Sequence, residues 1–443
     1  MRISDYENAQ VLDKKMWLDS IKMRVGLPYF GGKSRIGKYI FNNIFNMAVM
    51  MKQADKKADI FIDAFTGGGK MGLSIPKGWF DTIVINDLDY GVYSYYKCCK
   101  ERHIELIMMI DKIAEFFDKD MFHTFAWIRT FGKNCTKYET YKDGIKKEKV
   151  RDDEVLDELS AAAMTYWVTN SAFNNTTAPN STTYKLLKRK DEKDGDSSNK
   201  SKGKEAKEYD SKLEQELIEK IRLKAHKNIQ KLHYVLNSQN YIIENLDYRE
   251  LIKKYNGLEY SKITGEKEVS DIGFNKDEEK SKKNILWYFD PPYHPYALNA
   301  GKEATYACTF TVELAEEMVQ ILDGTKESTY GRLDYFIKSD YDTKDAYKKA
   351  EEYLEKGGNY LSANLKKWYK EMIKLEKDNH KITRAFDSLE VYPFMKICVG
   401  TFDKGAMINT DEDGKQEKSV GTEYIWTKGF PENYNAFEMY DAK

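Results

Sequence analysis

The stretch that decides the fold is Asn284–Tyr296, which reads NILWYFDPPYHPY. Its apolar run, Ile285–Phe289, has the length of a strand buried within a sheet, and it stops at the DPPY of residues 290–293. Proline cannot donate a hydrogen bond to a sheet ladder and fixes its own φ at about −65°, so the two prolines end the strand in a rigid turn. The sequence therefore predicts that Asp290 and Tyr293 lie side by side at the carboxyl end of a buried strand, where open α/β sheets bind ligands.

This turn resembles motif IV of the amino-methyltransferases, which methylate the exocyclic amine of a nucleobase with S-adenosylmethionine. An isolated Asp-Pro is an ordinary turn, whereas Asp-Pro-Pro-Tyr after an aromatic-rich strand is much rarer by chance. The amine is a poor nucleophile because its lone pair is delocalised into the ring, and the resemblance implies that Asp290 and the Pro291 carbonyl accept its two hydrogens. It also implies that Pro292 belongs to the catalytic turn and that Tyr293 stacks on a base flipped out of the duplex.

Composition limits the classes of protein to which the chain belongs. The 443 residues suffice for one large domain or two to three smaller ones, and 41% hydrophobic residues suffice for a sizeable core. Charged residues make up 32% of the chain but nearly cancel to a net charge of −1, so a globally basic nucleic-acid binder is not indicated. Any DNA-binding face must come from local clusters of positive charge.

Cysteine usage and the N-terminal residues lead us to expect a cytoplasmic protein. The cysteines form no C-x-x-C pair and no zinc-ligand spacing, so we expect no metal site, and scattered thiols suit a reducing compartment. Residues 1–10 contain no secretory apolar core, and no apolar run approaches the roughly 20 residues that span a bilayer. We therefore expect no membrane partner. The five cysteines are Cys98, Cys99, Cys135, Cys308 and Cys398.

A second apolar run ends in a glycine-rich turn. Asp59–Phe65 (DIFIDAF) predicts a buried strand, and the TGGG of residues 66–69 interrupts it, where glycines let the backbone approach a ligand. The next strand, Thr82–Ile85, runs into Asp87, a carboxylate about 20 residues past the glycines, which is the spacing at which such folds hold ribose hydroxyls. A hydride-transferring dinucleotide enzyme would need G-x-G-x-x-G, which this turn lacks.

This block resembles motifs I and II of the methyltransferases. The resemblance implies an S-adenosylmethionine pocket to which the block and Asp290 contribute. The positions that match motif I are Asp63, Phe65, Gly67 and Gly69, and Asn86-Asp87 matches motif II.

A tight loop, Leu27–Ser34 (LPYFGGKS), lies near the N-terminus. A P-loop is excluded, because Gly32 stands where that motif needs its lysine and no strand precedes the loop. The aromatic-Gly-Gly-Lys sequence instead resembles motif X of the Dam-like DNA adenine methyltransferases, in which this loop lies against the cofactor. The resemblance implies that Lys33 sits near the methionine carboxylate and that Tyr29 or Phe30 contacts the apolar parts of the cofactor.

Residues 91–235 differ from their flanks, because apolar positions recur there at helical spacing. The Dam-like family carries a helical DNA-recognition domain at this place, with an Asn-x-x-Phe-Asn loop, and the resemblance implies that Asn170, Phe173 and Asn174 contact the substrate. Residues 185–212 are charged and poor in apolar residues, so we predict a flexible segment whose lysines either stay solvated or track phosphates. Helices are predicted over residues 1–25, Ile36–Met51, Tyr93–Phe117, Met121–Phe131, Val155–Val168 and Leu213–Leu236.

The C-terminal half supplies the remaining strands. Asp247 follows the strand Tyr241–Asn245 and matches motif III, the acidic group near the adenine end of the cofactor. Tyr306 and Phe310 precede a helix over Val312–Leu322, and the resemblance implies a loop here that closes over the flipped base. Further strands are predicted over Asp334–Ile337, Met395–Phe402 and Thr422–Thr427, the last two joined as a hairpin by a loop at 403–420. Charged surface insertions are predicted at 256–283 and 342–381.

The motifs fall in the order X, I, II, helical insertion, III, IV, an order that chance matches would not reproduce. We therefore expect an α/β protein with a Rossmann-like methyltransferase mixed sheet, mostly parallel with an antiparallel C-terminal strand, plus a helical inserted DNA-recognition domain. Residues 1–90 and 236–443 would form the catalytic domain around the insertion at 91–235. The expected function is S-adenosylmethionine-dependent methylation of the N6 amine of an adenine flipped out of double-stranded DNA, in a restriction–modification, orphan or phage setting.

Three alternatives stay open at this point. The methylated amine could be N4 of cytosine, or the substrate could be RNA or a protein amide, since related Asx-Pro-Pro-Tyr enzymes act on those. The chain could also be a non-catalytic DNA-binding module that kept the fold. The motifs do not encode the recognition sequence, the oligomeric state (monomer or weak dimer) or the presence of a cognate nuclease.

Overall fold

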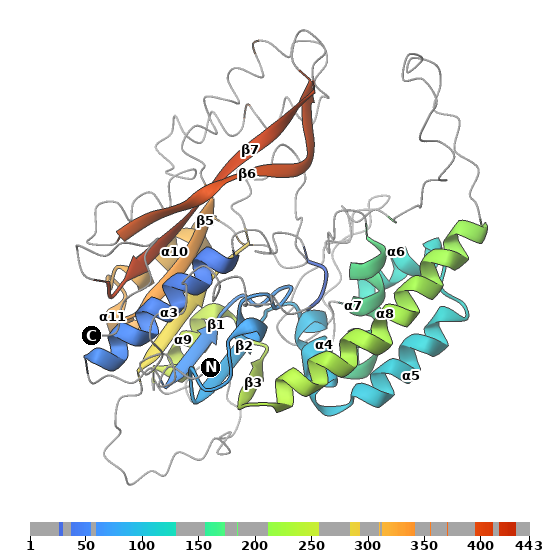
Figure 1. Ribbon diagram of the computed structural model, residues 1–443, viewed down its shortest axis with the longest axis horizontal. Helices are drawn as coiled ribbons and strands as arrows, with labels where there is room; N and C mark the ends of the chain where they lie inside the picture. Colours follow the sequence, from blue (N-terminus) through green and yellow to red (C-terminus); the bar gives the residue numbers. More distant parts are fainter. Residues whose placement is uncertain are drawn as a thin grey trace, which may run out of the picture.

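Seven strands form one sheet in the order β3-β2-β1-β4-β5-β7-β6 (Figure 1). The first five of these run parallel to their neighbours, β7 lies antiparallel to β5, and β6 lies antiparallel to β7. This topology confirms the predicted mixed sheet with its antiparallel C-terminal strands. The strands are β1 (Ile60–Asp63), β2 (Thr82–Asn86), β3 (Tyr241–Glu244), β4 (Ile285–Phe289), β5 (Phe336–Tyr341), β6 (Met395–Thr410) and β7 (Gln416–Lys428).

The structure is a computed structural model. It describes residues 26–29, 37–54, 59–129, 156–172, 184, 211–256, 284–292, 310, 312–341, 355, 370, 395–410 and 416–430. Within these ranges no helix combines the length and the apolarity needed to cross a membrane. The predicted helical arm at 1–25 lies outside them, as do most of the predicted charged segments at 185–212, 256–283 and 342–381.

Both faces of the parallel strands are buried, which explains why their sequences are continuous apolar runs. In β4, Leu286 and Tyr288 pack into the core on one face of the sheet, and Trp287 and Phe289 pack into the core on the other. β1 lies between β2 and β4, so the order of the strands reverses direction there. Open sheets have a ligand-binding crevice at such a point, beyond the carboxyl ends of the strands.

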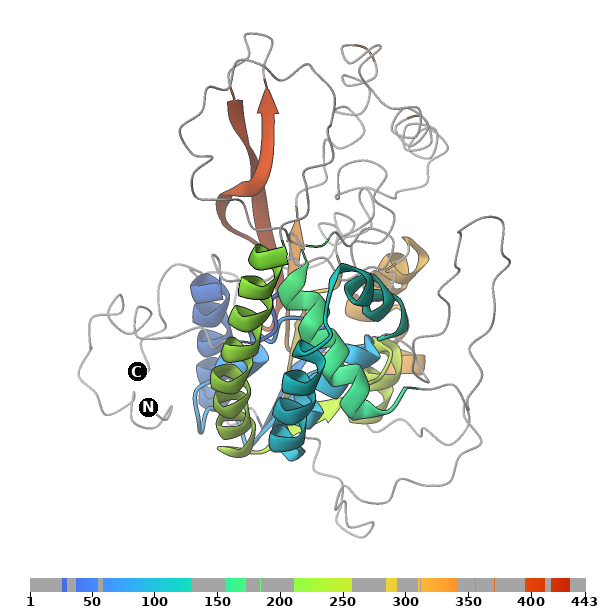
Figure 2. The ribbon, with the colours of Figure 1, turned by 90° about the vertical axis from the view of Figure 1, so that its right-hand side faces the viewer.

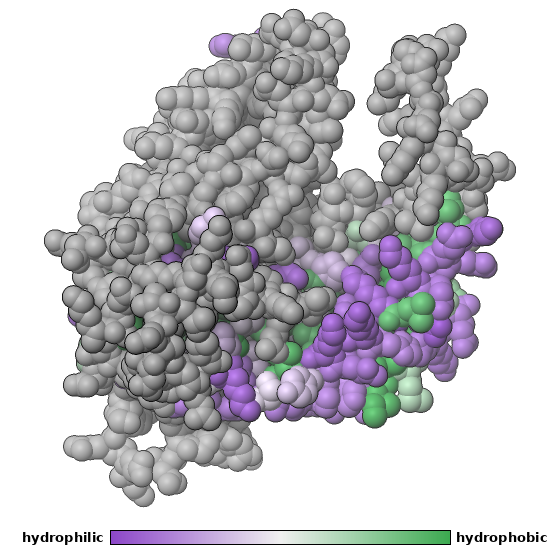
Figure 3. Space-filling view, viewed as in Figure 1, coloured by the Kyte–Doolittle hydropathy of each residue, from purple (hydrophilic) through white to green (hydrophobic). Residues whose placement is uncertain are grey.

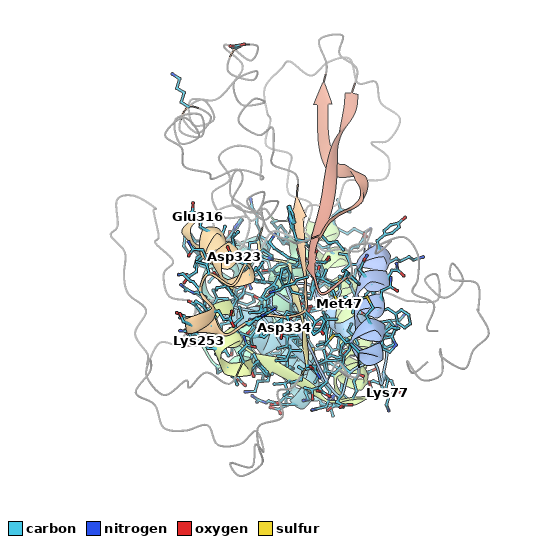
Figure 4. The ribbon with its side chains drawn as sticks, turned by 90° about the vertical axis from the view of Figure 1, so that its left-hand side faces the viewer. Met47, Lys77, Lys253, Glu316, Asp323 and Asp334 are labelled. Carbon is cyan, nitrogen blue, oxygen red and sulfur yellow. The ribbon has the colours of Figure 1, made fainter. Side chains whose placement is uncertain are left out.

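Helices cover the two faces of the sheet. α3 (Gly37–Gln53) packs on one face, and α9 (Tyr248–Tyr255) and α10 (Val312–Leu322) pack on the other. Figure 4 shows this layering, with Met47 of α3 on one side of the strands and Lys253 of α9 and Glu316 of α10 on the opposite side. A 3-10 turn, η1 (Gly72–Ser74), follows β1, and the short α11 (Glu327–Tyr330) packs against α9.

A layer of five helices, α4 to α8, stands beside the sheet in the described part of the chain (Figures 1 and 2). We call it the helical layer. α4 packs against α7 and α8, and α5 packs against the same two helices. The members are α4 (Tyr90–Glu101), α5 (His103–Ala114), α6 (Lys119–Ile128), α7 (Glu158–Ser171) and α8 (Ser211–Asn237).

The single helix predicted over Tyr93–Phe117 is wrong, because the structure has two helices there. Arg102 separates α4 from α5 with φ −134° and ψ 35°, outside the helical region, and its backbone N–H donates to Cys98 O at 2.8 Å. The apolar spacing continues across Arg102, so periodicity alone does not mark the break. The helices predicted from 121, 155 and 213 correspond to α6, α7 and α8, with ends shifted by a few residues.

Strand ends differ from prediction mainly where strands pair with distant partners. β1 ends at Asp63 rather than at Phe65, because the glycine-rich turn begins earlier. β5 runs to Tyr341 because β7 pairs along its whole length, from Phe336 with Lys428 to Tyr341 with Glu423. The predicted loop at 403–420 is mostly strand, with β6 reaching 410 and β7 starting at 416. The short helix α9 was not predicted, because only Tyr248, Leu251 and Ile252 form its buried face.

Leu286→Ala should lower the free energy of unfolding by about 2–5 kcal/mol, because Leu286 is fully buried in β4 and its truncation leaves a cavity. Leu223→Ala is the matched control. Leu223 is 57% exposed on α8, so its truncation should change the free energy by less than about 0.5 kcal/mol. Chemical denaturation measures both values, and equal losses would contradict this placement of the core.

Candidate active site

A pocket opens at the carboxyl ends of β1, β2 and β4, where the strand order reverses. Its wall is assembled from segments that are far apart in the chain. They are the loop before α3, the turn after β1, the ends of β2, β3 and β4, and the residues at the start of α10. Such a convergence at the switch point of an α/β sheet is the usual setting of a ligand site.

The glycine-rich turn after β1 is fixed by its own geometry and by β2. Gly67 and Gly69 have φ values of 47° and 71°, a left-handed region that favours glycine. Gly67 N donates to Asp87 Oδ2 at 2.7 Å, and Thr66 N donates to Asn86 O at 2.8 Å. The turn therefore lies against the end of β2, with its backbone lining the pocket.

The segment 26–29 lies directly on this turn. A Cβ on Gly26 would stand 1.9 Å from Gly68 O, so only glycine permits the contact. A Cβ on Gly67 would stand 2.9 Å from Cδ1 of Tyr29, whose ring lines the pocket. The predicted apposition of the N-terminal loop and the glycine turn is thus present for the described residues of that loop.

Tyr96 of α4 ties the same two segments together from below the turn. Its hydroxyl accepts a hydrogen bond from Leu27 N at 3.3 Å and donates one to Gly67 O at 3.0 Å. The ring is buried, so neither bond competes with water. The helical layer therefore helps to shape the pocket, a role for Tyr96 that the sequence analysis missed.

Asn86 joins the ends of three strands. Its Nδ2 donates to Ala64 O at 3.0 Å and to Leu246 O at 3.0 Å, and its Oδ1 accepts from Leu246 N at 2.9 Å. The side chain is 2% exposed, so it satisfies three backbone groups that water cannot reach. β1, β2 and the segment after β3 are held in register at the pocket by this one amide.

Asp63 places a nearly isolated carboxylate beneath the pocket. Oδ2 accepts from Gly72 N at 2.9 Å, whereas buried Oδ1 has no hydrogen-bond partner among the described residues. Burial, reinforced by the neighbouring Asp290 and Asp87, raises the pKa of Asp63 from 3.8 to about 7. A ligand with a cationic or N–H group would satisfy this oxygen.

Asp87 carries the second perturbed carboxyl group. Oδ2 accepts from Gly67 N at 2.7 Å and Oδ1 accepts from Asp89 N at 2.9 Å, which fixes the plane of the carboxylate at the pocket wall. Burial and the adjacent Asp89 raise the pKa of Asp87 to about 7, although these two backbone N–H groups and the Arg129 guanidinium favour its charged form.

Lys70 is the one cationic side chain among the described residues that line the pocket. It follows the glycine turn directly, and partial burial lowers its pKa. Five aspartates line the same pocket, so the charge pattern suits a ligand with positive groups and a single negative one. Lys70 was not among the predicted site residues, although it directly follows Gly69 of the glycine-rich turn.

An aromatic cluster forms the wall near β3 and α10. Phe65 lies 5.7 Å from Tyr248 and 6.0 Å from Phe310, measured between ring centroids, and the latter pair is perpendicular. Tyr248 and Phe310 are 6.1 Å apart. Next to it, Asp247 caps α9 by accepting from Arg249 N at 2.9 Å and pairs with that guanidinium at 2.7 Å. The cluster offers an apolar surface suited to an aromatic ring.

The residues after β4 stand at the opposite wall of the pocket. Asp290, Pro291 and Pro292 all line it, as predicted for the strand that decides the fold. The Tyr288 hydroxyl and Ser339 Oγ form a buried hydrogen bond of 2.8 Å, which ties β4 to β5 just before Asp290. This bond fixes the strand end from which the turn departs.

The structure brings nine of the predicted site residues to one pocket, and it leaves others elsewhere. Gly69 lies in the turn without lining the pocket, and Asn170 lies at the end of α7, where its Oδ1 accepts from Lys224 Nζ at 2.9 Å. The nine are Tyr29, Asp63, Phe65, Gly67, Asp87, Asp247, Asp290, Pro291 and Pro292. Outside the described residues lie Phe30, Gly32, Lys33, Phe173, Asn174, Tyr293 and Tyr306.

Asn86→Asp should lower the free energy of unfolding by about 2–4 kcal/mol, because it sets a carboxylate against two backbone carbonyls that now accept from the amide. Asn240→Asp is the control. Asn240 is exposed, and its amide donates to Thr82 Oγ1 at 2.9 Å. Its change should cost less than about 0.5 kcal/mol. Chemical denaturation measures the free energy of unfolding of both variants. An Asn86→Asp variant as stable as the parent would show that the Asn86 side chain does not hold the three strand ends together.

The perturbed carboxyl of Asp63 should make stability depend on pH. Its pKa rises from 3.8 to about 7 on folding, so between these values the native state holds a proton that the unfolded chain has lost. Stability from this group therefore falls as the pH rises from about 4 to 7. Asp63→Asn should raise the free energy of unfolding at pH 8 by roughly 2–4 kcal/mol and change it little at pH 4. Exposed Asp120→Asn is the control, and a pH-independent effect of Asp63→Asn would contradict the assignment.

Comparison with known proteins matches one family to more than half of the chain. The family model described as D12 class N6 adenine-specific DNA methyltransferase matches residues 29–257. The match includes the glycine turn, Asp87, the helical layer and Asp247. A search of curated proteins found no match.

Proposed function

Since the chain belongs to the D12 class N6 adenine-specific DNA methyltransferases, we propose that it binds S-adenosylmethionine in the pocket described above and methylates an adenine flipped out of double-stranded DNA. The observation that carries the proposal is the convergence of nine predicted residues, spread from Tyr29 to Pro292, on one pocket at the carboxyl edge of the sheet. The family itself implies an adenine-specific DNA methyltransferase and a methyl donor of this kind. Base flipping and the roles of single residues are the proposal.

The charges and the aromatic wall of the pocket suit the methyl donor. S-Adenosylmethionine supplies an electrophilic methyl group on a positively charged sulfur. Asp63, whose Oδ1 lacks a partner among the described residues, would accept from the cationic amine, and Lys70 would face the carboxylate. Asp87 would accept from the ribose hydroxyls, and the aromatic cluster around Phe65 would contact the adenine ring.

The turn after β4 would hold the amine that is methylated. The Asp290 carboxylate and the Pro291 carbonyl would accept its two hydrogens, which weakens conjugation of the lone pair with the ring. Asp290 stands close enough to Asp63 to raise the pKa of that carboxyl, so amine and cofactor would meet between them. Tyr293, which the structure does not describe, would stack on the flipped base.

The helical layer would supply the DNA-binding surface. α8 presents Lys220, Lys224, Lys227 and Lys231 on its exposed surface at spacings of three and four residues, and Figure 3 shows hydrophilic side chains gathered over this helix. Lys224 contacts Asn170, which we propose as a substrate contact. These lysines provide the local positive charge that a chain with a net charge of −1 needs to bind phosphates.

Asp290→Ala should abolish methyl transfer, by about a thousandfold or more, while the fold largely persists, since a group acting on the substrate is removed. Asp81→Ala is the matched control, because Asp81 is exposed at the amino end of β2, across the sheet from the pocket. The assay is transfer of labelled methyl from S-adenosylmethionine to mixed-sequence double-stranded DNA, followed by nucleoside analysis. Parental turnover by Asp290→Ala would refute the assignment of the turn, and label in cytosine would show that the methylated base is not adenine.

Lys70→Met should weaken S-adenosylmethionine binding by about tenfold, because a charge-assisted contact with the carboxylate is lost. Lys77→Met serves as control. Lys77 is exposed and lies away from the pocket, near the amino ends of the strands (Figure 4). Equilibrium dialysis with labelled cofactor measures both affinities. Equal affinities of the two variants would show that Lys70 does not contact the cofactor.

A further inference from the structure

Arg129 is a fully buried cation supplied by the helical layer. It follows α6 directly, and its guanidinium lies between the start of α4 and the middle of α7. Nη2 donates to Asp89 Oδ2 at 2.9 Å, and Nη1 donates to Asp89 Oδ1 at 3.2 Å and to Thr165 Oγ1 at 3.3 Å. Asp89 is 1% exposed, so this is a bidentate ion pair without solvent.

The backbone of α4 approaches this pair closely at Gly91. A Cβ on Gly91 would stand 2.1 Å from Thr165 Oγ1 and 3.0 Å from Arg129 Nη1. Asp89 also caps α4, because its Oδ1 accepts from Gly91 N at 2.9 Å. The pair is thus locked between three helices.

A continuous chain of contacts leads from Arg129 to the glycine turn. Arg129 binds the Asp89 carboxylate, the backbone N–H of Asp89 donates to Asp87 Oδ1 at 2.9 Å, and Asp87 Oδ2 accepts from Gly67 N at 2.7 Å. Three contacts therefore connect the helical layer with the backbone that lines the pocket. Asp87 is the member that faces the proposed cofactor.

The residues in this series of contacts also determine the charges around Asp87. Asp89 is the carboxylate that opposes ionisation of Asp87 most strongly, and Arg129 is the cation that favours it. Asp63 on β1 adds a further negative charge, and Asp290 after β4 acts on Asp63. Lys70 and Asp247 line the same pocket, and the uncharged Tyr96 hydroxyl lies beneath the turn. Arg129 is the buried positive charge among these groups.

We infer that Arg129 is a positioning residue for the methyl donor, and that it acts through Asp89 to orient Asp87 and to favour its charged form. This inference rests on the proposed function of the pocket. The helical layer would then have a second role besides the proposed DNA contact. The positive charge next to Asp87 comes from the residue that follows α6 and not from the sheet. Loss of Arg129 would leave Asp89 as an uncompensated buried charge beside Asp87.

The test is calorimetric titration of the full chain with S-adenosylmethionine at pH 6, 7, 8 and 9. Binding by the parent should strengthen as the pH rises through 7, because the cofactor favours ionised carboxylates, whereas loss of the amine proton of the cofactor above about pH 8 weakens binding by all variants alike. In Arg129→Met the pH at which binding strengthens should increase by about one unit. Binding should then be about fivefold weaker than that of the parent at pH 7 and near parental at pH 9. In Asp89→Asn the pH at which binding strengthens should decrease. In the double variant Asp89→Asn/Arg129→Met this pH should return toward that of the parent.

Lys97→Met is the matched control. Lys97 and Glu158 form another ion pair between α4 and α7, at 2.6 Å, which has no contact with Asp87. Its removal should leave the pH profile parental. If Arg129→Met does not fold, the comparison of Asp89→Asn with the double variant still decides, because replacing both charges of a buried pair often preserves stability.

Opposite displacements by the two single variants support the inference. It is overturned if both leave the profile unchanged, if both move it the same way, or if affinity falls equally at every pH, as a purely structural defect would produce. A parent that fails to bind S-adenosylmethionine at every pH would overturn the proposed function, and this inference with it, whereas normal binding with unmoved profiles overturns this inference alone.

Discussion

The pocket depends on the two hydrogen bonds that the Asp87 carboxylate accepts. This carboxylate accepts from Gly67 N on one side and from Asp89 N on the other, so it joins the turn after β1 to the start of α4. The glycine turn in turn supports the segment before α3, through the Gly26–Gly68 approach and the Tyr96 hydroxyl. Asn86, one residue earlier, ties the same strand end to β1 and to the segment after β3. Two adjacent side chains at the end of β2 thus organise four parts of the chain.

The pocket brings several carboxyl groups together where few water molecules reach them. Asp63 and Asp87 both have a pKa of about 7 because burial disfavours their charged forms. A pocket lined by hydrophobic or neutral polar side chains would make the folded protein more stable. The carboxyl groups therefore lower the stability of the fold, as is common at sites that bind a charged ligand. The buried Arg129–Asp89 pair offsets part of this repulsion from outside the sheet, which links the helical layer to the chemistry of the pocket.

Much of this organisation follows from the sequence. Apolar runs such as Ile285–Phe289 predict strands because both faces of a parallel strand are buried, and Asp290 and Asp87 are predictable as strand-end residues at the switch point. Contacts between distant residues are not encoded in local patterns. The Arg129–Asp89 pair spans 40 positions, and the Asn86–Leu246 bonds span 160. The break at Arg102 and the length of β6 and β7 were missed for the same reason, since packing and pairing partners fix them and periodicity does not.

In the proposed function, S-adenosylmethionine binds among these carboxylates. Calorimetric titration at pH 7 in two buffers with different ionisation enthalpies measures the protons exchanged on binding. A ligand that brings positive charge to half-ionised carboxyl groups should release protons, and Asp87→Asn should reduce the number released. Binding with no proton exchange, or an unchanged number in Asp87→Asn, would contradict the claim that the cofactor is held by Asp63 and Asp87.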